Sequence, residues 1–225
     1  MERRAVLWDM DGVLVDDGEQ HYRSWLETLT EEGIAFDRQK FQQTFGMNNR
    51  RTLEFLLGYT LPPEWVQEIS ERKEARFREL IRGQVQLAPG ARTWLERLRE
   101  AGCLQAVASS APQANLDALI EELQIGEFFQ EVVSGANLPG KPDPQIFWET
   151  ARRLDILPAC CVVVEDSLAG VEAAKRAGMR CLAVTTTNPR VALGQADVIV
   201  DDLRDLTLAD FLGAEYTSQA NQGLP

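Results

Sequence analysis

The chain has 225 residues and a formal net charge of −12 at pH 7, from 23 basic and 35 acidic side chains. It contains no basic block, which argues against a nucleic-acid partner, because such a partner needs a clustered surface of Lys and Arg. No run of about 20 apolar residues occurs, so we expect no membrane-spanning helix. The first apolar run starts close to Met1 and leaves no room for a signal peptide, so we expect a cytoplasmic protein.

Apolar runs and helical spacing predict the elements in chain order. Residues 5–8 are apolar and predict a short buried strand. Residues 18–86 show helical spacing without strand signals, and the helices predicted there are 21–32, 38–45, 51–57 and about 63–81. Helices and strands then alternate. The predicted helices are 91–101, 113–123, 144–154 and 169–177, and the predicted strands are 104–108, 129–133, 161–164, 181–184 and 198–200.

This order of elements predicts an α/β fold. Alternating helices and strands, with strands apolar on both faces, indicate a Rossmann-like parallel sheet with helices on both sides. An all-helical domain is inserted after the first strand. We expect the α/β core at 1–16 and 88–214, the helical domain at 17–87, and a frayed tail at 215–225. The four cysteines form no Cys-x-x-Cys pair and are expected to be reduced and buried.

Two aspartates follow the first predicted strand. Asp9 and Asp11 are two positions apart, and like charges that close raise each other's pKa. Mg²⁺ takes oxygen ligands and offsets such repulsion, and a carboxylate so placed also serves as a nucleophile that forms an aspartyl-phosphate. Gly12 allows a sharp backbone turn. An ordinary turn is the alternative; a calcium loop is disfavoured because its twelfth position would be Gln20 instead of Glu.

Polar side chains also end three later strands or follow them in a loop. Ser109 and Ser110 precede a helix, where they are expected to hold phosphate oxygens or, alternatively, to cap the helix. Lys141 lies in a loop stiffened by two prolines, and its alternative role is that of a solvated lysine. Glu165 and Asp166 end another strand and fit a role as metal ligands; the alternative, compatible with that role, is that Asp166 or Ser167 caps the following helix. Ligands bind at the carboxyl ends of parallel strands, so these groups are expected to share one crevice suited to phosphoryl transfer.

With these motifs in this order, the chain resembles the haloacid dehalogenase superfamily. The resemblance is specifically to the branch of phosphatases and β-phosphoglucomutases with a helical cap after the first strand. The resemblance covers nearly the whole chain and rests on Asp9-Met10-Asp11-Gly12-Val13, Ser109, Lys141 in Gly-Lys-Pro-Asp-Pro, and Glu165-Asp166-Ser167.

The resemblance implies a role for each motif residue. Asp9 is the nucleophile, and Asp11 is the general acid/base; the second aspartate argues against dehalogenation. The implied Mg²⁺ ligands are Asp9, the backbone carbonyl of Asp11 and Asp166, with Glu165 assisting. Ser109, with Ser110 beside it, and Lys141 are the implied phosphate ligands.

The cap shows one similarity to the mutases and two departures. His21 and Trp25, four residues apart, resemble a mutase cap helix in which His and Trp bear on acid/base positioning and cap closure; alternatively, Trp25 belongs to the core. The mutase arginine that holds a second phosphate is replaced by Asn49, and Arg50 substitutes for it only after a shift of one residue. A mutase lysine and asparagine are replaced by Pro112 and Gln113.

We therefore expect a monomeric Mg²⁺-dependent phosphatase of small phosphomonoesters, namely sugar or polyol phosphates, that acts through phospho-Asp9. β-Phosphoglucomutase, which interconverts hexose 1-phosphate and 6-phosphate, is the first alternative. A catalytically silent protein that binds a phosphate ligand is a remote alternative, because fold alone does not guarantee function.

Overall fold

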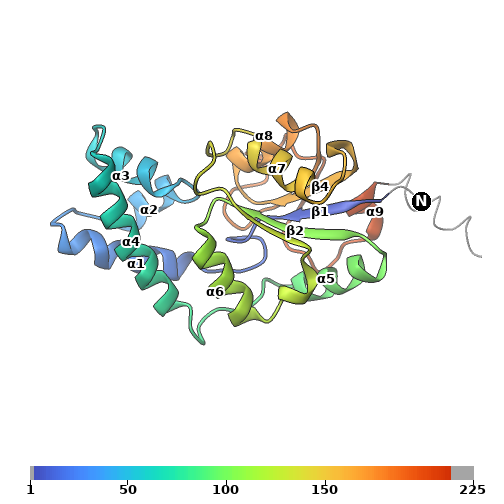
Figure 1. The fold of residues 1–225 in the computed structure, drawn as a ribbon, viewed down its shortest axis with the longest axis horizontal. Helices are drawn as coiled ribbons and strands as arrows, with labels where there is room; N and C mark the ends of the chain where they lie inside the picture. The colour runs from blue at the N-terminus through green and yellow to red at the C-terminus, as the bar shows by residue number, and fades with distance from the viewer. Residues whose placement is uncertain (1–2, 214–225) are drawn as a thin grey trace, which may run out of the picture.

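The computed structural model describes residues 3–213, and its centre is a parallel sheet. Within these residues the sheet has six strands in the order β3-β2-β1-β4-β5-β6, and every neighbouring pair is parallel (Figure 1). This confirms the predicted fold class. The strands are β1 Ala5–Trp8, β2 Leu104–Ser109, β3 Glu131–Ser134, β4 Cys161–Glu165, β5 Arg180–Val184 and β6 Val198–Val200.

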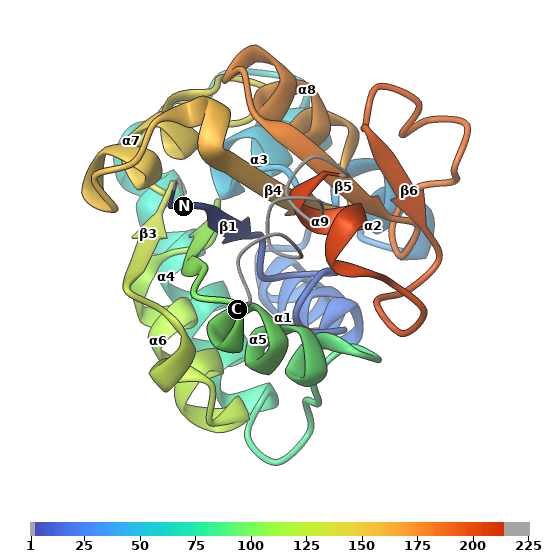
Figure 2. The same cartoon turned by 90° about the vertical axis from the view of Figure 1, so that its right-hand side faces the viewer.

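Helices cover both faces of the sheet, because alternate residues of each strand point to opposite sides. Val6 and Trp8 lie in one buried cluster with residues of α5, α6 and α9, whereas Ala5 and Leu7 lie in a second cluster with residues of α7 and α8. Figure 2 shows α7 and α8 on one side of the sheet and α5 on the other. These helices are α5 Ala91–Glu100, α6 Gln113–Leu123, α7 Gln145–Arg153, α8 Leu168–Arg176 and α9 Leu208–Leu212.

The part of the chain between β1 and α5 is mostly helical, as predicted, and its helices form a lobe at the left of Figure 1. It has its own buried cluster, which includes Trp25, Leu29, Leu53 and Ile69. Its helices are α1 Gly18–Glu31, α2 Arg38–Thr44, α3 Asn49–Leu57 and α4 Pro63–Leu80. We call α1 to α4 the helical lobe. The domain limits proposed from the sequence stay predictions, and the predicted tail at 215–225 lies outside the described residues.

Local chemistry explains where the predicted boundaries differ. Helix α3 begins at Asn49, two residues before the predicted start, because the side chain of Asn48 accepts a hydrogen bond from the Arg51 N–H at 3.0 Å and caps the helix. Strand β3 begins two residues later than predicted, because the 3₁₀ turn Gly126–Phe128 precedes it. The short helix α9 was not predicted; Thr207 and Asp210 form a capping box at its start.

The register of the sheet brings the strand ends together. Trp8 at the end of β1 lies beside Val107 of β2 and Val164 of β4. The residues that follow these positions therefore meet at one edge of the sheet. All four cysteines are buried, as predicted. Between residues 3 and 213 no helix combines the length and the apolar character needed to cross a membrane.

Candidate active site

Lys141 joins two strand ends at the carboxyl edge of the sheet. Its ammonium donates hydrogen bonds to Asp9 Oδ1 at 2.8 Å and to Glu165 Oε1 at 2.5 Å, and it lies 3.5 Å from the carbonyl oxygen of Ala108. All three acceptors come from the ends of β1, β4 and β2. The Lys141 side chain is only 8% exposed, so the ion pairs are shielded from bulk water. The prediction that Lys141 points at the strand-end carboxylates agrees with this geometry.

The carboxylates around Lys141 outnumber its single positive charge. One oxygen each from Asp9, Glu165 and Asp166 lie within 4.8 Å of one another. Burial raises the pKa of Asp9 well above its usual range, although Lys141 opposes the shift and Glu165 adds to it. Burial and the charge of Glu165 raise the pKa of Asp166 to about 7. Such a surplus of buried oxygen ligands fits a hard divalent cation.

The Glu165 carboxylate is held in place by hydrogen bonds from the two residues that follow it. Its Oε2 accepts hydrogen bonds from the N–H groups of Asp166 and Ser167 and from the Ser167 hydroxyl, each at 2.9 Å. A Cβ at Gly170 would lie 1.9 Å from this carboxylate, so α8 passes close to it only because that residue is glycine. Ser167 caps α8 by accepting from the Gly170 N–H at 3.0 Å, which agrees with the alternative reading of that motif.

Asp166 faces the turn after the first aspartate. Its Oδ2 would be 2.0 Å from a Cβ at Gly12, where φ is +78°, so both the backbone conformation and the close approach require glycine. The Thr187 hydroxyl donates a hydrogen bond to Asp166 Oδ2, and the Thr186 hydroxyl donates to the Gly12 carbonyl at 2.5 Å. The sequence analysis missed both threonines. Both lie just after β5, at a fifth strand end, and that position is the signal that could have indicated them.

Asp11 lies close to His21 of the helical lobe. His21 Nε2 is 3.7 Å from Asp11 Oδ1 and 3.6 Å from Asp17 Oδ2. Burial opposes ionisation of Asp11, but its interactions with His21 and Asp17 outweigh burial, so the Asp11 pKa is lowered. Burial raises the pKa of Asp17 well above its usual range, and the charge of Asp11 adds to this. The His21 ring stacks on Phe77 with the ring centroids 4.0 Å apart, so its position is fixed.

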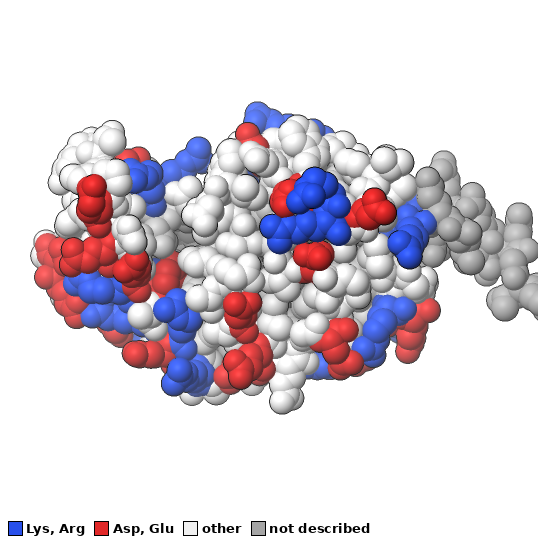
Figure 3. Space-filling view, in the orientation of Figure 1, with Lys and Arg blue, Asp and Glu red and all other residues white. Residues whose placement is uncertain are grey.

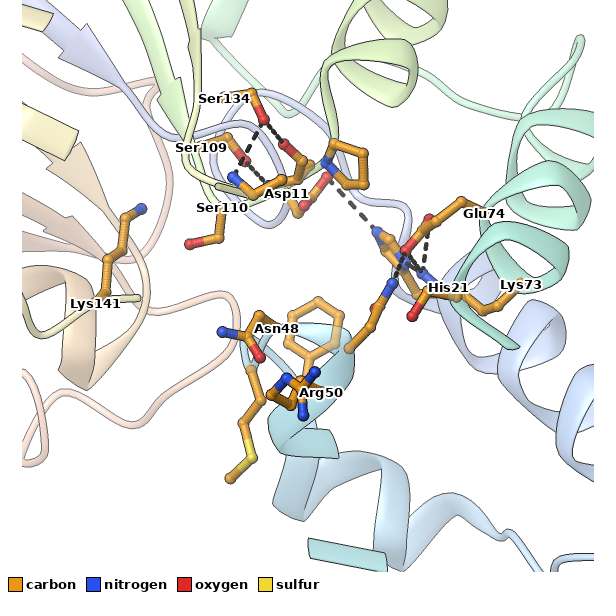
Figure 4. A pocket seen from close by; sticks show the side chains of 18 of the residues that line it. Asp11, His21, Asn48, Arg50, Lys73, Glu74, Ser109, Ser110, Ser134 and Lys141 are labelled. Carbon is orange, nitrogen blue, oxygen red and sulfur yellow. Dashed lines mark hydrogen bonds and ion pairs between the residues drawn. The ribbon is translucent and has the colours of Figure 1, made fainter. Parts of the chain in front are cut away.

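The two serines line the cavity at the end of β2. Ser109 is buried, and its hydroxyl oxygen accepts a hydrogen bond from the Ala111 N–H at 3.2 Å. Pro112 occupies the N-cap position of α6, and no side chain caps that helix, so the alternative role of the serines as its cap is wrong. Ser109, Ser110 and Ser134 lie together on one wall of the cavity, as Figure 4 shows.

The remaining cap residues differ in what they contact. Asn49 Nδ2 donates a hydrogen bond to Glu74 Oε1 at 2.8 Å. Arg50 lines the cavity, but its Nη1 lies 3.4 Å from both Glu54 Oε1 and the carbonyl oxygen of Leu61, so its charge is partly compensated within the lobe. Trp25 is buried in the core of the helical lobe, as its alternative role predicted, and also borders the cavity.

The core and the helical lobe enclose a cavity of about 1000 Å³ between them. The α/β core forms one side of the cavity wall and the helical lobe forms the other (Figure 4). Core residues on the wall are Asp9, Asp11, Ser109, Ser110, Lys141 and Asp166, and lobe residues are His21, Trp25, Asn49, Arg50, Lys73 and Glu74. Figure 3 shows acidic and basic side chains interspersed on one face of the molecule, without a continuous basic area on that face.

Comparisons with known proteins agree with this architecture. Residues 3–178 match the family model described as haloacid dehalogenase-like hydrolase. The β-phosphoglucomutase of Bacillus subtilis (strain 168) is 33% identical over 215 residues, which cover 91% of this chain and 92% of that protein. Hexitol phosphatase B of Escherichia coli (strain K12) is 32% identical over 219 residues, which cover 93% of this chain and 96% of that protein.

A longer plant protein and a solved structure extend the comparison. The chloroplastic 5-amino-6-(5-phospho-D-ribitylamino)uracil phosphatase of Arabidopsis thaliana is 30% identical over 212 residues, and this chain spans 56% of its length. CbbY from Rhodobacter sphaeroides, crystallised with phosphate and as a variant with xylulose-(1,5)bisphosphate, has a TM-score of 0.84 and 28% identity. That match covers 93% of this chain and 99% of CbbY.

The chain belongs to the haloacid dehalogenase-like hydrolases. Within that family its relatives include phosphatases and a β-phosphoglucomutase, the branch that the motifs predicted. Family membership confirms that the protein is an enzyme of the hydrolase class. The predicted monomeric state and cytoplasmic location stay predictions.

Proposed function

We propose that this protein is a Mg²⁺-dependent phosphatase of small sugar or polyol phosphomonoesters, acting through phospho-Asp9. The observation that carries the proposal is the buried Asp9 carboxylate, paired with Lys141 at 2.8 Å and facing a cavity that also contains Asp11. The names of its relatives, a hexitol phosphatase among them, support a sugar or polyol phosphate as substrate.

The reaction has two steps that return the enzyme to its starting state. In the first, an Asp9 carboxylate oxygen forms a bond to phosphorus while the bond from phosphorus to the ester oxygen breaks, and Asp11 gives its carboxyl proton to that oxygen. In the second, Asp11 takes a proton from water as the water oxygen attacks phosphorus, and the bond to Asp9 breaks. The products are an alcohol and inorganic phosphate.

Asp11 must hold a proton in the first step, although His21 lowers its pKa in the structure without ligand. A phosphate group in the cavity adds negative charge near Asp11, and nearby negative charge raises the pKa of a carboxyl group. Substrate binding is therefore expected to favour the protonated form that the first step needs.

The strand-end carboxylates fit Mg²⁺. Asp9, Asp166 and the backbone carbonyl of Asp11 would hold the ion, with Glu165 beside them as the partner of Lys141. When bound, Mg²⁺ would offset the negative charges of phosphate and carboxylates. Lys141, Ser109 and Ser110 are the proposed phosphate ligands, and the helical lobe is proposed to exclude bulk water from the cavity.

β-Phosphoglucomutase is the second candidate, favoured by Arg50, which lines the cavity one residue from the position where the mutases have arginine. Two observations favour the phosphatase instead. Asn49 occupies the arginine position and binds Glu74, and Arg50 lies close to Glu54. A second phosphate group therefore meets fewer uncompensated charges on this side.

A phosphate-release assay tests the proposal. With Mg²⁺, the protein should release phosphate from sugar or polyol monophosphates, and Asp9→Asn should abolish release. Conversion of hexose 1-phosphate to 6-phosphate that depends on a bisphosphate primer, with little phosphate release, would assign the mutase instead. Binding of phosphate without turnover, and without a beryllium fluoride adduct of Asp9, would assign the catalytically silent protein.

A further inference from the structure

Glu74 of α4 is a buried carboxylate that accepts hydrogen bonds from three other side chains. Lys73 Nζ lies 3.0 Å from each of its two oxygens. Asn49 Nδ2 donates to Oε1 at 2.8 Å, and Asn115 Nδ2 donates to Oε2 at 2.6 Å. Burial opposes its ionisation, but Lys73 and the other partners outweigh burial and lower the Glu74 pKa. Because these partners already bind both carboxylate oxygens, Glu74 is not a candidate for binding a substrate hydroxyl.

The same lysine also fixes the protonation of His21. Lys73 Nζ lies 2.9 Å from His21 Nδ1, and an ammonium group only donates hydrogen bonds, so Nδ1 must be the acceptor. A neutral ring with an accepting Nδ1 carries its proton on Nε2. That nitrogen is the one that lies 3.7 Å from Asp11 Oδ1 and 3.6 Å from Asp17 Oδ2. The same proton argues against a metal ion bound by Asp11, Asp17 and His21, because a protonated nitrogen has no free lone pair.

Asn115 contributes to this hydrogen-bond network from the α/β core, whereas its other members lie in the helical lobe. It lies in the first turn of α6, the helix that follows the serine loop, and its side chain is buried. Its Oδ1 accepts a hydrogen bond from Arg78 Nη1 at 2.9 Å, while its Nδ2 binds Glu74. Glu74 and Arg78 are four residues apart and share one face of α4. The Asn115 amide therefore holds both side chains and joins α4 to the start of α6, just after Ser109 and Ser110.

We propose that Asn115 and Glu74 are positioning residues for Asp11, acting through Lys73 and His21. The inference rests on the proposed function of Asp11 as the general acid/base. The bond from Asn115 on α6 places Glu74, and Glu74 holds Lys73. Lys73 in turn binds His21 Nδ1, which keeps Nε2 3.7 Å from Asp11 Oδ1. Loss of the bond between Asn115 and Glu74 should therefore shift the His21 ring and slow proton transfer from Asp11.

Two substrates with different leaving groups test the inference. Sorbitol 6-phosphate has an alkoxide leaving group that needs a proton, whereas p-nitrophenyl phosphate has a phenolate leaving group that needs little help from an acid. Comparison uses kcat/KM, which reports steps up to formation of phospho-Asp9 and is insensitive to its later hydrolysis. Asn115→Leu removes the donor at similar volume, and Glu74→Gln keeps the shape but removes the charge that holds Lys73.

Each variant should lose on the order of tenfold or more in kcat/KM for sorbitol 6-phosphate and about twofold or less for p-nitrophenyl phosphate. Equal losses on the two substrates, or no loss on either, would overturn the inference while leaving the proposed function intact. Failure of the unmodified protein to release phosphate from any sugar or polyol monophosphate would instead overturn the proposed function.

A matched control distinguishes a loss of Asp11 positioning from a general disturbance of the structure. Glu122 lies on α6, as Asn115 does, and its carboxylate accepts a hydrogen bond from the N–H of Gly83, just beyond α4, at 2.7 Å. Glu122→Gln should leave the ratio of the two kcat/KM values unchanged. If Asn115→Leu does not fold, Asn115→Ser, which keeps a small polar group that is too short to reach Glu74, should show the same selective loss; an unchanged ratio in that folded variant counts against the inference.

Discussion

The two sides of the cavity use buried charge in opposite ways. On the core side, Asp9 and Glu165 share the Lys141 ammonium, Asp166 lies beside them, and the pKa values of Asp9 and Asp166 are raised. On the side of the helical lobe, Glu74 is matched by Lys73 and by two amides, and its pKa is lowered. A site that is incomplete by itself is suited to bind a charged ligand. A site that is already satisfied is suited to hold other groups in place.

The largest effect is expected at the core side, from Asp9→Asn. The amide is a poor nucleophile, so phosphate release should fall to background for every substrate. The fold should persist, because Lys141 keeps its bond to Glu165 at 2.5 Å. Phosphate release and thermal unfolding together check this. Substantial turnover by a folded Asp9→Asn would show that another group carries the chemistry.

Removal of Lys141 tests whether its charge is needed to balance the core side. Lys141→Met leaves the buried carboxylates of Asp9 and Glu165 without their cation, which typically costs about 3–5 kcal/mol of unfolding free energy. Urea unfolding measures it. The matched substitution Lys175→Met removes an ion pair with Asp197 that is about one third exposed, and should cost about 1 kcal/mol or less. Equal costs would contradict the comparison.

Mg²⁺ should stabilise the protein by completing the core side. At 100 times its dissociation constant, a ligand that binds only the folded state adds about 2.7 kcal/mol. Protons compete for the ligands, and the pKa of Asp166 is raised to about 7, so the stabilisation should be larger at pH 8 than at pH 6. Thermal unfolding with and without Mg²⁺ measures it. Asp166→Asn should lose most of the effect, and the exposed-pair control Asp202→Asn should retain it.

The smallest effect is expected from Arg50→Ala on the lobe side. The Arg50 side chain is 42% exposed and lies 3.4 Å from Glu54, so its removal should change the unfolding free energy by about 0.5 kcal/mol or less. For a phosphatase of monophosphates, kcat/KM should also change little. A marked loss of primer-dependent hexose phosphate conversion in this variant would favour the mutase.

The core side was accessible from the sequence because parallel strands align their ends. Asp9, Ser109 and Glu165 each follow an apolar run, and the register of the sheet then brings them together. Lys141 was accessible because its loop carries a familiar motif. The strand pattern thus predicts where these residues lie, and no knowledge of how distant side chains pack is needed.

The lobe side was not accessible in the same way. Lys73 and Glu74 lie in a charged helix and look like solvated surface residues, and neighbours in a helix do not normally face each other. Their burial depends on how α4 meets α6, a contact between segments 41 residues apart in the pair Glu74 and Asn115. No local pattern encodes that contact. The prediction for His21 and Asn49 named the right part of the cavity but missed the residues that hold them.

Gly170 sets a limit on how this protein can be made more robust. Alanine in place of a helical glycine ordinarily adds roughly 1 kcal/mol to helix formation, which makes such sites attractive to protein engineers. Here the added methyl group would lie 1.9 Å from the Glu165 carboxylate and displace it from Lys141. A thermostabilised version of this enzyme would therefore need to keep a flexible residue in α8, where a general rule recommends removing it.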